Sequence, residues 1–182
     1  MEMIQHIQAA RSLLKQGKVI AYPTEAVYGL GCCPFNEAAV LRLLALKGRT
    51  VNKGLLLLIY KWQQLSDLIS PISEANMQRV QATWPGHVTW VFPKSTMIPS
   101  WISGEHATVA IRMTAHPVAR ALCINGPIVS TSANISGALP ALEIATLNKQ
   151  FPHGIDGCVV GKLGDSTMPS AIYDVLTGQK LR

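Results

Sequence analysis

The chain has 182 residues, of which 48% are hydrophobic and only 14% are charged. This length suits one domain over residues 1–182, because single cores usually stop growing at about 100 to 200 residues. The mean hydropathy of +0.23 excludes an intrinsically disordered chain. No stretch reaches the roughly 18 uninterrupted apolar residues that a membrane-spanning helix needs, so we expect no membrane partner.

The surplus of positive charge limits the choice of partners only weakly. Sixteen lysines and arginines face ten aspartates and glutamates, which gives a formal net charge of +6. Such a surplus suits an anionic partner such as a nucleotide, RNA or phosphate. A generally basic surface that keeps the protein in solution explains the same composition equally well.

The N-terminus and the cysteines favour a cytoplasmic location. Residues 3–14 carry apolar side chains at helical spacing, without the continuous apolar stretch of a signal peptide. The four cysteines form no CxxC pair, so we expect reduced and mostly buried thiols rather than disulfides or a zinc site.

Strands and helices alternate along the chain. Hydrophobic periodicity and cap residues predict helices over residues 3–14, 37–47, 62–68, 73–84, 117–125 and 143–150. Strands are predicted over residues 18–22, 55–60, 87–92, 108–113, 128–131, 157–161 and 170–175. Several strands follow one another without a crossover helix. We therefore expect an α/β fold with a twisted, mixed parallel and antiparallel sheet flanked by helices.

Polar residues gather at four points where strands or helices are expected to end. These clusters are "YPTEAVYGLG" (22–31), "LKGRTVNKG" (46–54), "IRMTAHP" (111–117) and "STSANISG" (130–137). Loops beyond strand ends are where sheets of this kind carry binding residues. The first cluster fits an ordinary turn as well as a ligand loop, although its glycines would let a ligand approach the backbone.

The second and third clusters each leave two interpretations open. Lys47 and Arg49 fit two parts of a polyphosphate, but cations at a helix end also complement the helix dipole. Arg112 lies inside an apolar strand, where it needs either a carboxylate ligand or an acidic partner within the protein.

The fourth cluster is the densest. Five hydroxyl or amide side chains within residues 130–136 exceed what one turn needs, and they can donate to phosphate or carboxylate oxygens without adding charge. The P-loop, the dinucleotide-binding fingerprint, the zinc-protease and hydrolase motifs and the RNA-binding RNP1 pattern are all missing from the sequence.

In this order, six stretches resemble the signatures of the YrdC/TsaC family of threonylcarbamoyl-AMP synthases. The matching stretches are "AYPTEAVYGLG", "LKGR", "WPGHVTWVF", "VAIRMTAHP", "STSANISG" and "PSAIYD". Each is weak by itself, but six in register span nearly the whole chain. Longer relatives continue into a second domain, so the chain resembles the short form of the family.

The resemblance implies a nucleotidyltransferase with a large positive concave face. Such enzymes make threonylcarbamoyl-adenylate and pyrophosphate from L-threonine, bicarbonate or CO2, and ATP. A partner threonylcarbamoyl transferase complex then modifies the adenosine beside the anticodon of tRNA, and tRNA itself is a further candidate partner. Mg2+ is expected to arrive with ATP and to need few or no protein ligands.

The resemblance also assigns individual residues. Lys47 and Arg49 match cations that hold ATP phosphates, and Ser132 and Asn134 match the nucleotide-binding SxN pair. The positions around the threonine substrate are matched by Thr24, Arg112, Ser130 and Ser170. No nucleophilic side chain is expected, so catalysis would rest on positioned cations and neutral donors that stabilise charge on the phosphates.

Three positions depart from the family pattern, which often has two prolines and an acid there. These positions are Thr50, His87 and Ala115. None is an expected ligand, so the departures bear on loop rigidity rather than on activity.

Two other functions stay open at this stage. A non-enzymatic RNA-binding module, acting on tRNA or in ribosome assembly, would use the basic surface. It would have no use for a cation such as Arg112 inside an apolar strand. A related enzyme would form a carbamoyl-adenylate on another acceptor, as in hydrogenase maturation, and carbamoyl phosphate would then replace threonine and bicarbonate.

Overall fold

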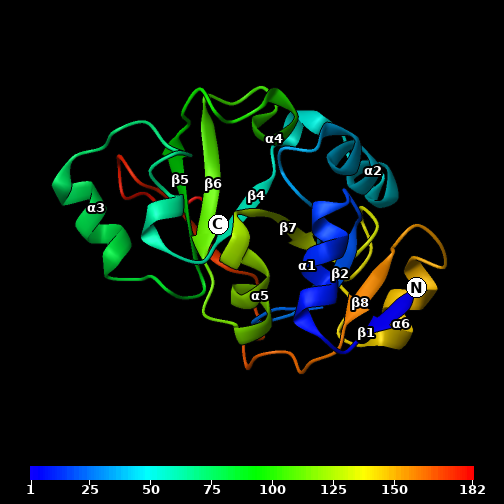
Figure 1. Cartoon of the computed structure of the whole chain (residues 1–182). Helices are drawn as coiled ribbons and strands as arrows, with labels where there is room; N and C mark the ends of the chain where they lie inside the picture. Colours follow the sequence, from blue (N-terminus) through cyan, green and yellow to red (C-terminus); the bar gives the residue numbers. More distant parts are fainter.

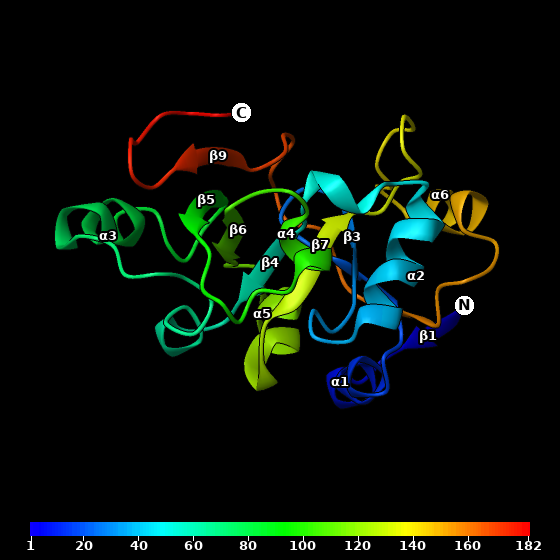
Figure 2. The same ribbon diagram turned by 90° about the horizontal axis from the view of Figure 1, so that it is seen from above.

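Nine strands form one continuous mixed sheet in the computed structural model, which describes residues 1–182 (Figures 1 and 2). The strands are β1 (Glu2–Ile4), β2 (Ile20–Pro23), β3 (Tyr28–Gly31), β4 (Leu56–Ile59), β5 (Val88–Pro93), β6 (Thr108–Met113), β7 (Ile128–Ser132), β8 (Gly157–Val159) and β9 (Ala171–Asp174). Their order in the sheet is β1-β8-β2-β3-β7-β4-β6-β5-β9. Four of the neighbouring pairs are parallel and four are antiparallel, which confirms the predicted mixed sheet.

Six α-helices and three 3-10 turns surround the sheet. They are α1 (Ile7–Lys15), α2 (Glu37–Lys47), α3 (Glu74–Gln81), α4 (Ser100–Ser103), α5 (Pro117–Leu122), α6 (Ile144–Gln150), η1 (Val51–Lys53), η2 (Trp62–Gln64) and η3 (Cys123–Asn125). Seen from above, α1 and α5 lie on one side of the central strands, and the sheet curves so that its edge strand β9 and the C-terminal segment lie toward the opposite side (Figure 2). No helix combines the length and apolar character needed to cross a membrane.

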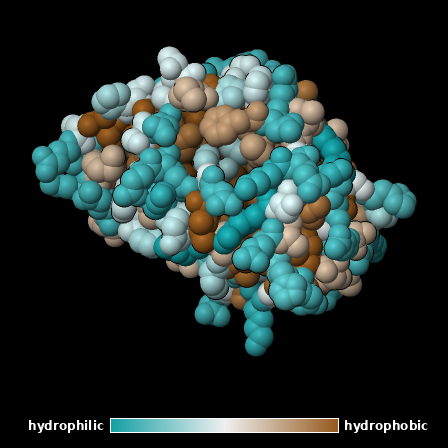
Figure 3. All heavy atoms as spheres, in the orientation of Figure 1, coloured by the Kyte–Doolittle hydropathy of each residue, from teal (hydrophilic) through white to brown (hydrophobic).

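The surface on the side of α1 and α5 is mostly hydrophilic (Figure 3). Hydrophobic residues form only small separate patches on this face (Figure 3). Beneath α1 and α5 lies a cluster of 11 buried apolar residues, and a larger cluster of 32 fills the remaining core.

Helix α2 begins and ends where its sequence predicts. The side-chain oxygen of Asn36 accepts the Ala39 N–H at 3.0 Å, which satisfies one of the free donors of the first turn. Gly48 follows the helix with a φ of 59°, a left-handed conformation that glycine adopts without steric cost. Capping therefore fixes both ends of this helix locally.

Several predicted boundaries are wrong. Residues 2–4 form the edge strand β1 beside β8 instead of starting the first helix, because pairing with a distant strand outweighs their helical spacing. Residues 28–31, expected in a loop, form β3 and make a hairpin with β2. The helices expected over 62–68 and 73–84 shorten to η2 and α3.

The register of the central strands decides which side chains face the site. Leu56 of β4 is paired with Ala110 of β6 on one side and with Ser130 of β7 on the other. These three residues form one row that lines a cavity. Their neighbours Leu57, Ile111 and Val129 point to the opposite face and join the larger core, since successive side chains in a strand alternate.

Candidate functional site

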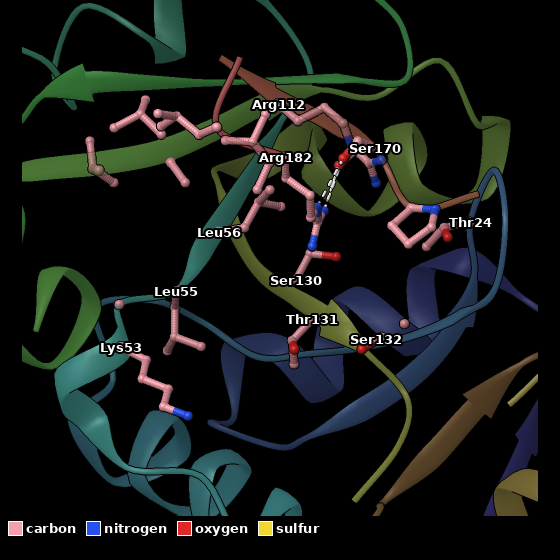
Figure 4. Close-up of a pocket in the computed structure, with 18 of the residues that line it drawn as sticks. Thr24, Lys53, Leu55, Leu56, Arg112, Ser130, Thr131, Ser132, Ser170 and Arg182 are labelled. Atoms are coloured by element: carbon pink, nitrogen blue, oxygen red, sulfur yellow. Dashed lines mark hydrogen bonds between the residues drawn. The ribbon is translucent and has the colours of Figure 1, made fainter. Parts of the chain in front are cut away.

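A cavity of about 540 Å³ lies over this row of strand residues (Figure 4). Six of the eight site residues expected from the sequence line it: Thr24, Arg49, Arg112, Ser130, Ser132 and Ser170. They come from the hairpin β2–β3, the loop after α2, the strands β6 and β7 and the segment before β9. The fold thus brings together residues that lie as much as 146 positions apart in the sequence (170 − 24).

Arg112 of β6 is only 6% exposed, and its surroundings bear out one of the two interpretations of the sequence. Its Nη2 lies 3.3 Å from Glu25 Oε2, so an internal acid partner is present. Its Nη1 lies 3.0 Å from His87 Nδ1. Its Nε is buried without a partner, although the side chain lines the cavity. The guanidinium therefore keeps one buried donor that no protein group satisfies.

Glu25 stays ionised beside Arg112. Burial alone would raise the pKa of its carboxyl group, but the Arg112 guanidinium and a hydrogen bond from Thr114 Oγ1 outweigh burial and hold the pKa below its usual value. Glu25 Oε1 accepts that hydrogen bond at 2.6 Å and a second one from the Ala115 N–H at 3.2 Å.

The hydroxyls of the cavity are held by neighbouring groups. Tyr22 is fully buried, and its hydroxyl donates to Ser130 Oγ at 2.8 Å. Burial raises the pKa of Tyr22, so it stays a neutral donor. Ser170 Oγ lies 2.9 Å from Thr89 Oγ1, and Thr24 Oγ1 donates to the Val27 carbonyl at 2.7 Å.

Lys47 and Asn134 do not line the cavity, in contrast to the expectation from the sequence. Lys47 is only 3% exposed, and its Nζ donates to the carbonyl oxygens of Ser132 and Asn134. Its own carbonyl accepts the Ser136 N–H at 2.8 Å. Burial, together with the nearby charge of Arg49, lowers the pKa of Lys47 to about 8. The ammonium is turned to the backbone because the "STSANISG" loop crosses the end of α2.

The side chain of Asn134 shapes the same loop. Its Nδ2 donates to the carbonyls of Ile135 and Ala138 at 2.9 and 3.0 Å, and its Oδ1 accepts from Ser132 Oγ. The polar density of the loop therefore serves partly as turn chemistry and partly as cavity lining, so both interpretations of this cluster apply.

A second group of cations lies at the other end of the cavity. Arg49 Nη2 donates to the Gly54 carbonyl at 2.7 Å, while its Nε is buried without a partner. Lys53 of η1 enters from the same side, opposite Arg112 and Arg182 (Figure 4). The hydroxyls of Ser130 and Ser132 lie between the two cationic ends.

Four residues of the site had no predicted role: Tyr22, Glu25, His87 and Arg182. Arg182 reaches the cavity because residues 176–182 turn back along β9, where the Leu181 N–H donates to the Ile172 carbonyl at 2.7 Å. Its Nη2 donates to the Ser170 carbonyl at 3.0 Å (Figure 4). His87, expected to affect only loop rigidity, lines the cavity and contacts Arg112. No local sequence signal marks Arg182 or His87 as a residue of the site. The acidic partner of Arg112, by contrast, had to be one of the ten aspartates and glutamates of the chain, and it is Glu25.

The donors of the site do not form a metal cage. No group of three or more His, Cys, Asp or Glu side chains is placed to hold a metal ion. The arrangement consists instead of two cationic ends joined by hydroxyls, which suits an elongated ligand with a carboxylate and a phosphate chain.

Comparisons with known proteins identify the family to which the chain is similar. The Sua5/YciO/YrdC family, described as telomere recombination, matches residues 12–182. A threonylcarbamoyl-AMP synthase of Coxiella burnetii is 48% identical over 180 residues, which cover 98% of this chain and 97% of the relative. One of Halorhodospira halophila is 48% identical over 97% of this chain and 93% of its own.

A solved structure gives the same fold. The structure of P. abyssi Sua5 complexed with L-threonine superposes with a TM-score of 0.89 and 32% identity over 98% of this chain. The chain covers 55% of that protein, so it spans about half the length of the solved relative.

Proposed function

Since the chain belongs to the Sua5/YciO/YrdC family, we propose that it is an ATP-dependent nucleotidyltransferase that makes threonylcarbamoyl-AMP and pyrophosphate. Its substrates are L-threonine, bicarbonate or CO2, and ATP. The observation that carries the proposal is the buried, cavity-lining Arg112 with an unpartnered Nε, facing a second cationic end across a line of hydroxyls. A simple phosphate-tracking RNA surface needs no such buried arginine.

The threonine end of the cavity is built around Arg112. Its free donor takes the α-carboxylate, because a guanidinium binds a carboxylate more strongly than neutral donors do. Ser130, Ser170 and Thr24 surround the position next to it and supply hydroxyls for the polar groups of the amino acid.

The ATP end is built around Arg49 and the loop after β7. Arg49 lines the cavity and takes phosphate oxygens, and the Ser132 hydroxyl, which donates to Asn134 Oδ1 in the free protein, turns to them when the nucleotide binds. Lys47 and Asn134 contribute by fixing the shape of the loop that presents Ser132. The Lys47 ammonium donates to the carbonyls of Ser132 and Asn134, and the Asn134 amide donates to the carbonyl of Ile135. We thereby assign Lys47 to the loop rather than to direct phosphate contact.

The chemistry follows from placing the two ends in one cavity. The threonine amine adds to the carbon of CO2 and loses a proton, which gives a carbamate. A carbamate oxygen then attacks the α-phosphorus of ATP, the bond to the β-phosphate oxygen breaks, and pyrophosphate leaves. Charge builds on phosphate oxygens during this step, so Arg49 and the neutral hydroxyls stabilise it.

Mg2+ and the later partners belong to the proposal as well. Mg2+ would be carried in by ATP and would neutralise part of the charge on its phosphates, with few or no protein ligands of its own. The product is a reactive mixed anhydride, and a threonylcarbamoyl transferase complex acting on tRNA in the cytoplasm consumes it.

The test is pyrophosphate release by the purified protein with ATP and Mg2+, with L-threonine and bicarbonate added or omitted separately. Release that requires both is expected. Release with carbamoyl phosphate in place of both would point to the related carbamoyl-adenylate chemistry. No release under any combination, with salt-sensitive RNA binding intact, would replace the enzyme by an RNA-binding module.

A further inference from the structure

His87 joins two walls of the cavity. It comes directly before β5, and its ring lies between β6 and the segment that leads into β9. Its Nδ1 is 3.0 Å from Arg112 Nη1, and its Nε2 is 2.8 Å from the Met168 carbonyl oxygen. No other imidazole contacts Arg112.

The two partners determine which nitrogen carries the hydrogen. Arg112 Nη1 can only donate, so Nδ1 of His87 must accept with its lone pair. The Met168 carbonyl can only accept, so Nε2 carries the hydrogen and donates it. His87 is therefore a neutral acceptor toward Arg112 and a donor toward Met168.

A neutral acceptor has a specific advantage at this position. Glu25 Oε2 lies near Nη2 of Arg112 and already offsets one unit of positive charge. A second carboxylate at Nη1 would make the cluster net negative and repel a substrate carboxylate. His87 fixes Nη1 without adding negative charge, while Glu25 fixes the Nη2 side. Two anchored groups of a planar guanidinium set the direction of the unpartnered Nε.

We propose that His87 is a positioning residue that aims the Arg112 guanidinium at the α-carboxylate of the amino-acid substrate. The inference rests on the proposed function, because it takes Arg112 as the carboxylate partner. The competing interpretation is structural: His87 would only tie the segment containing Met168 to β5, and its contact with Arg112 would be incidental.

Three substitutions separate the two contacts of the ring. In His87→Asn the side-chain oxygen can occupy the place of Nδ1 and accept from Arg112, but the side chain is too short to reach Met168. In His87→Gln the terminal amide nitrogen can occupy the place of Nε2 and donate to the Met168 carbonyl. His87→Ala removes both contacts. The affinity of the full chain for L-threonine is measured by isothermal titration calorimetry, and the KM for threonine by pyrophosphate release.

We expect His87→Asn to bind L-threonine within about threefold of the parent. His87→Gln and His87→Ala should each bind about tenfold more weakly, the size of one lost hydrogen bond to a charged group. The KM for threonine should rise in the same ratio, with the KM for ATP unchanged. The matched control is the exposed His153→Asn, which should leave both constants unchanged.

The remaining outcomes overturn the inference. Retained affinity in His87→Gln with loss in His87→Asn would assign the role to the Met168 contact, as would loss of thermal stability in proportion to affinity. Equal affinity in all three variants, or equal loss in all three, would also contradict a role of the Nδ1 contact. Failure of the unsubstituted protein to bind L-threonine at all would instead contradict the proposed function.

Discussion

At the scale of single residues, the site depends on charges that are buried and counterbalanced. Arg112 has an acidic partner, a neutral acceptor and a buried Nε without a partner. The protein therefore fixes the position of the guanidinium but leaves one of its donors unsatisfied. Arg49 resembles it, with one hydrogen bond to the backbone and a buried Nε without a partner. Both arginines combine a structural anchor with a free donor, which is how a rigid binding group is made.

Glu25→Gln tests the anchor of Arg112. Removing one partner of a buried ion pair leaves the other charge uncompensated, so we expect a loss of about 3 kcal/mol in the free energy of unfolding at pH 7. The pKa of Glu25 is lowered in the folded protein, so its stabilising effect is complete above its usual value and is lost as the pH falls through the lower folded value. The difference in the free energy of unfolding between the parent and Glu25→Gln should shrink below about pH 4. Urea unfolding at pH 7 and pH 3 measures it, and a constant difference would contradict the ion pair.

Arg49→Ala and Ser132→Ala test the phosphate end. Each removes a cavity-lining donor without opening the core, so we expect kcat/KM for ATP to fall at least about 100-fold, in line with the loss of one transition-state donor. The melting temperature should stay within a few degrees of the parent value. If stability falls in step with activity, the two residues are structural.

At the scale of elements, local signals and tertiary contacts contribute unequally. The N-cap residue Asn36 and the C-cap residue Gly48 determine where α2 begins and ends, and both can be identified in the sequence. By contrast, β3 reads "YGLG", in which two glycines weaken the intrinsic strand preference, yet all four residues are buried between β2 and β7. Its neighbours make it a strand, and its glycines allow the backbone to pass close to them.

Gly31→Ala tests this close approach. An added Cβ would lie 2.6 Å from the Val129 carbonyl oxygen and 2.8 Å from the Tyr22 ring, neither of which can move without disturbing the sheet. We expect a loss of about 3 kcal/mol or more in the free energy of unfolding. Gly137→Ala is the control, since nothing lies within 4 Å of its added Cβ and only the φ of +85° opposes it, at a cost of about 1 kcal/mol. Denaturant titration of both variants decides; equal losses would mean that the contact with Val129 is not limiting.

At the scale of the whole molecule, the cavity exists because distant segments meet over one face of the sheet. The hairpin β2–β3, the loop after α2, the strands β6 and β7 and the segment before β9 supply its predicted residues. The C-terminal segment closes one side, where Arg182 contacts Ser170 (Figure 4). None of these segments forms a site alone.

Arg182→Ala tests the contribution of this closing segment. The substitution removes the hydrogen bonds from the guanidinium to Ser170 and one positive charge from the cavity. We expect kcat/KM to fall about tenfold or more, because Ser170 loses the hydrogen bonds that hold its carbonyl and hydroxyl groups at the substrate end of the cavity. Pyrophosphate release measures it, with Lys180→Ala on the same segment as control. Equal effects of the two substitutions would indicate a general effect of the segment rather than of the Arg182 side chain.

The sequence by itself determined the local features: the helix caps, the apolar strands, the mixed sheet and the four polar clusters. Of the eight ligands that the family resemblance assigned, six line the cavity, and five of these come from the four clusters. These features depend on neighbours within a few positions, where spacing and side-chain type are sufficient. Only the tertiary structure decided that residues 28–31 are a strand, that Lys47 is turned toward loop carbonyls, and that Glu25, His87 and Arg182 meet at the site. Those outcomes depend on contacts between residues far apart in the chain, and hydrophobic periodicity carries no information about which distant groups will be neighbours.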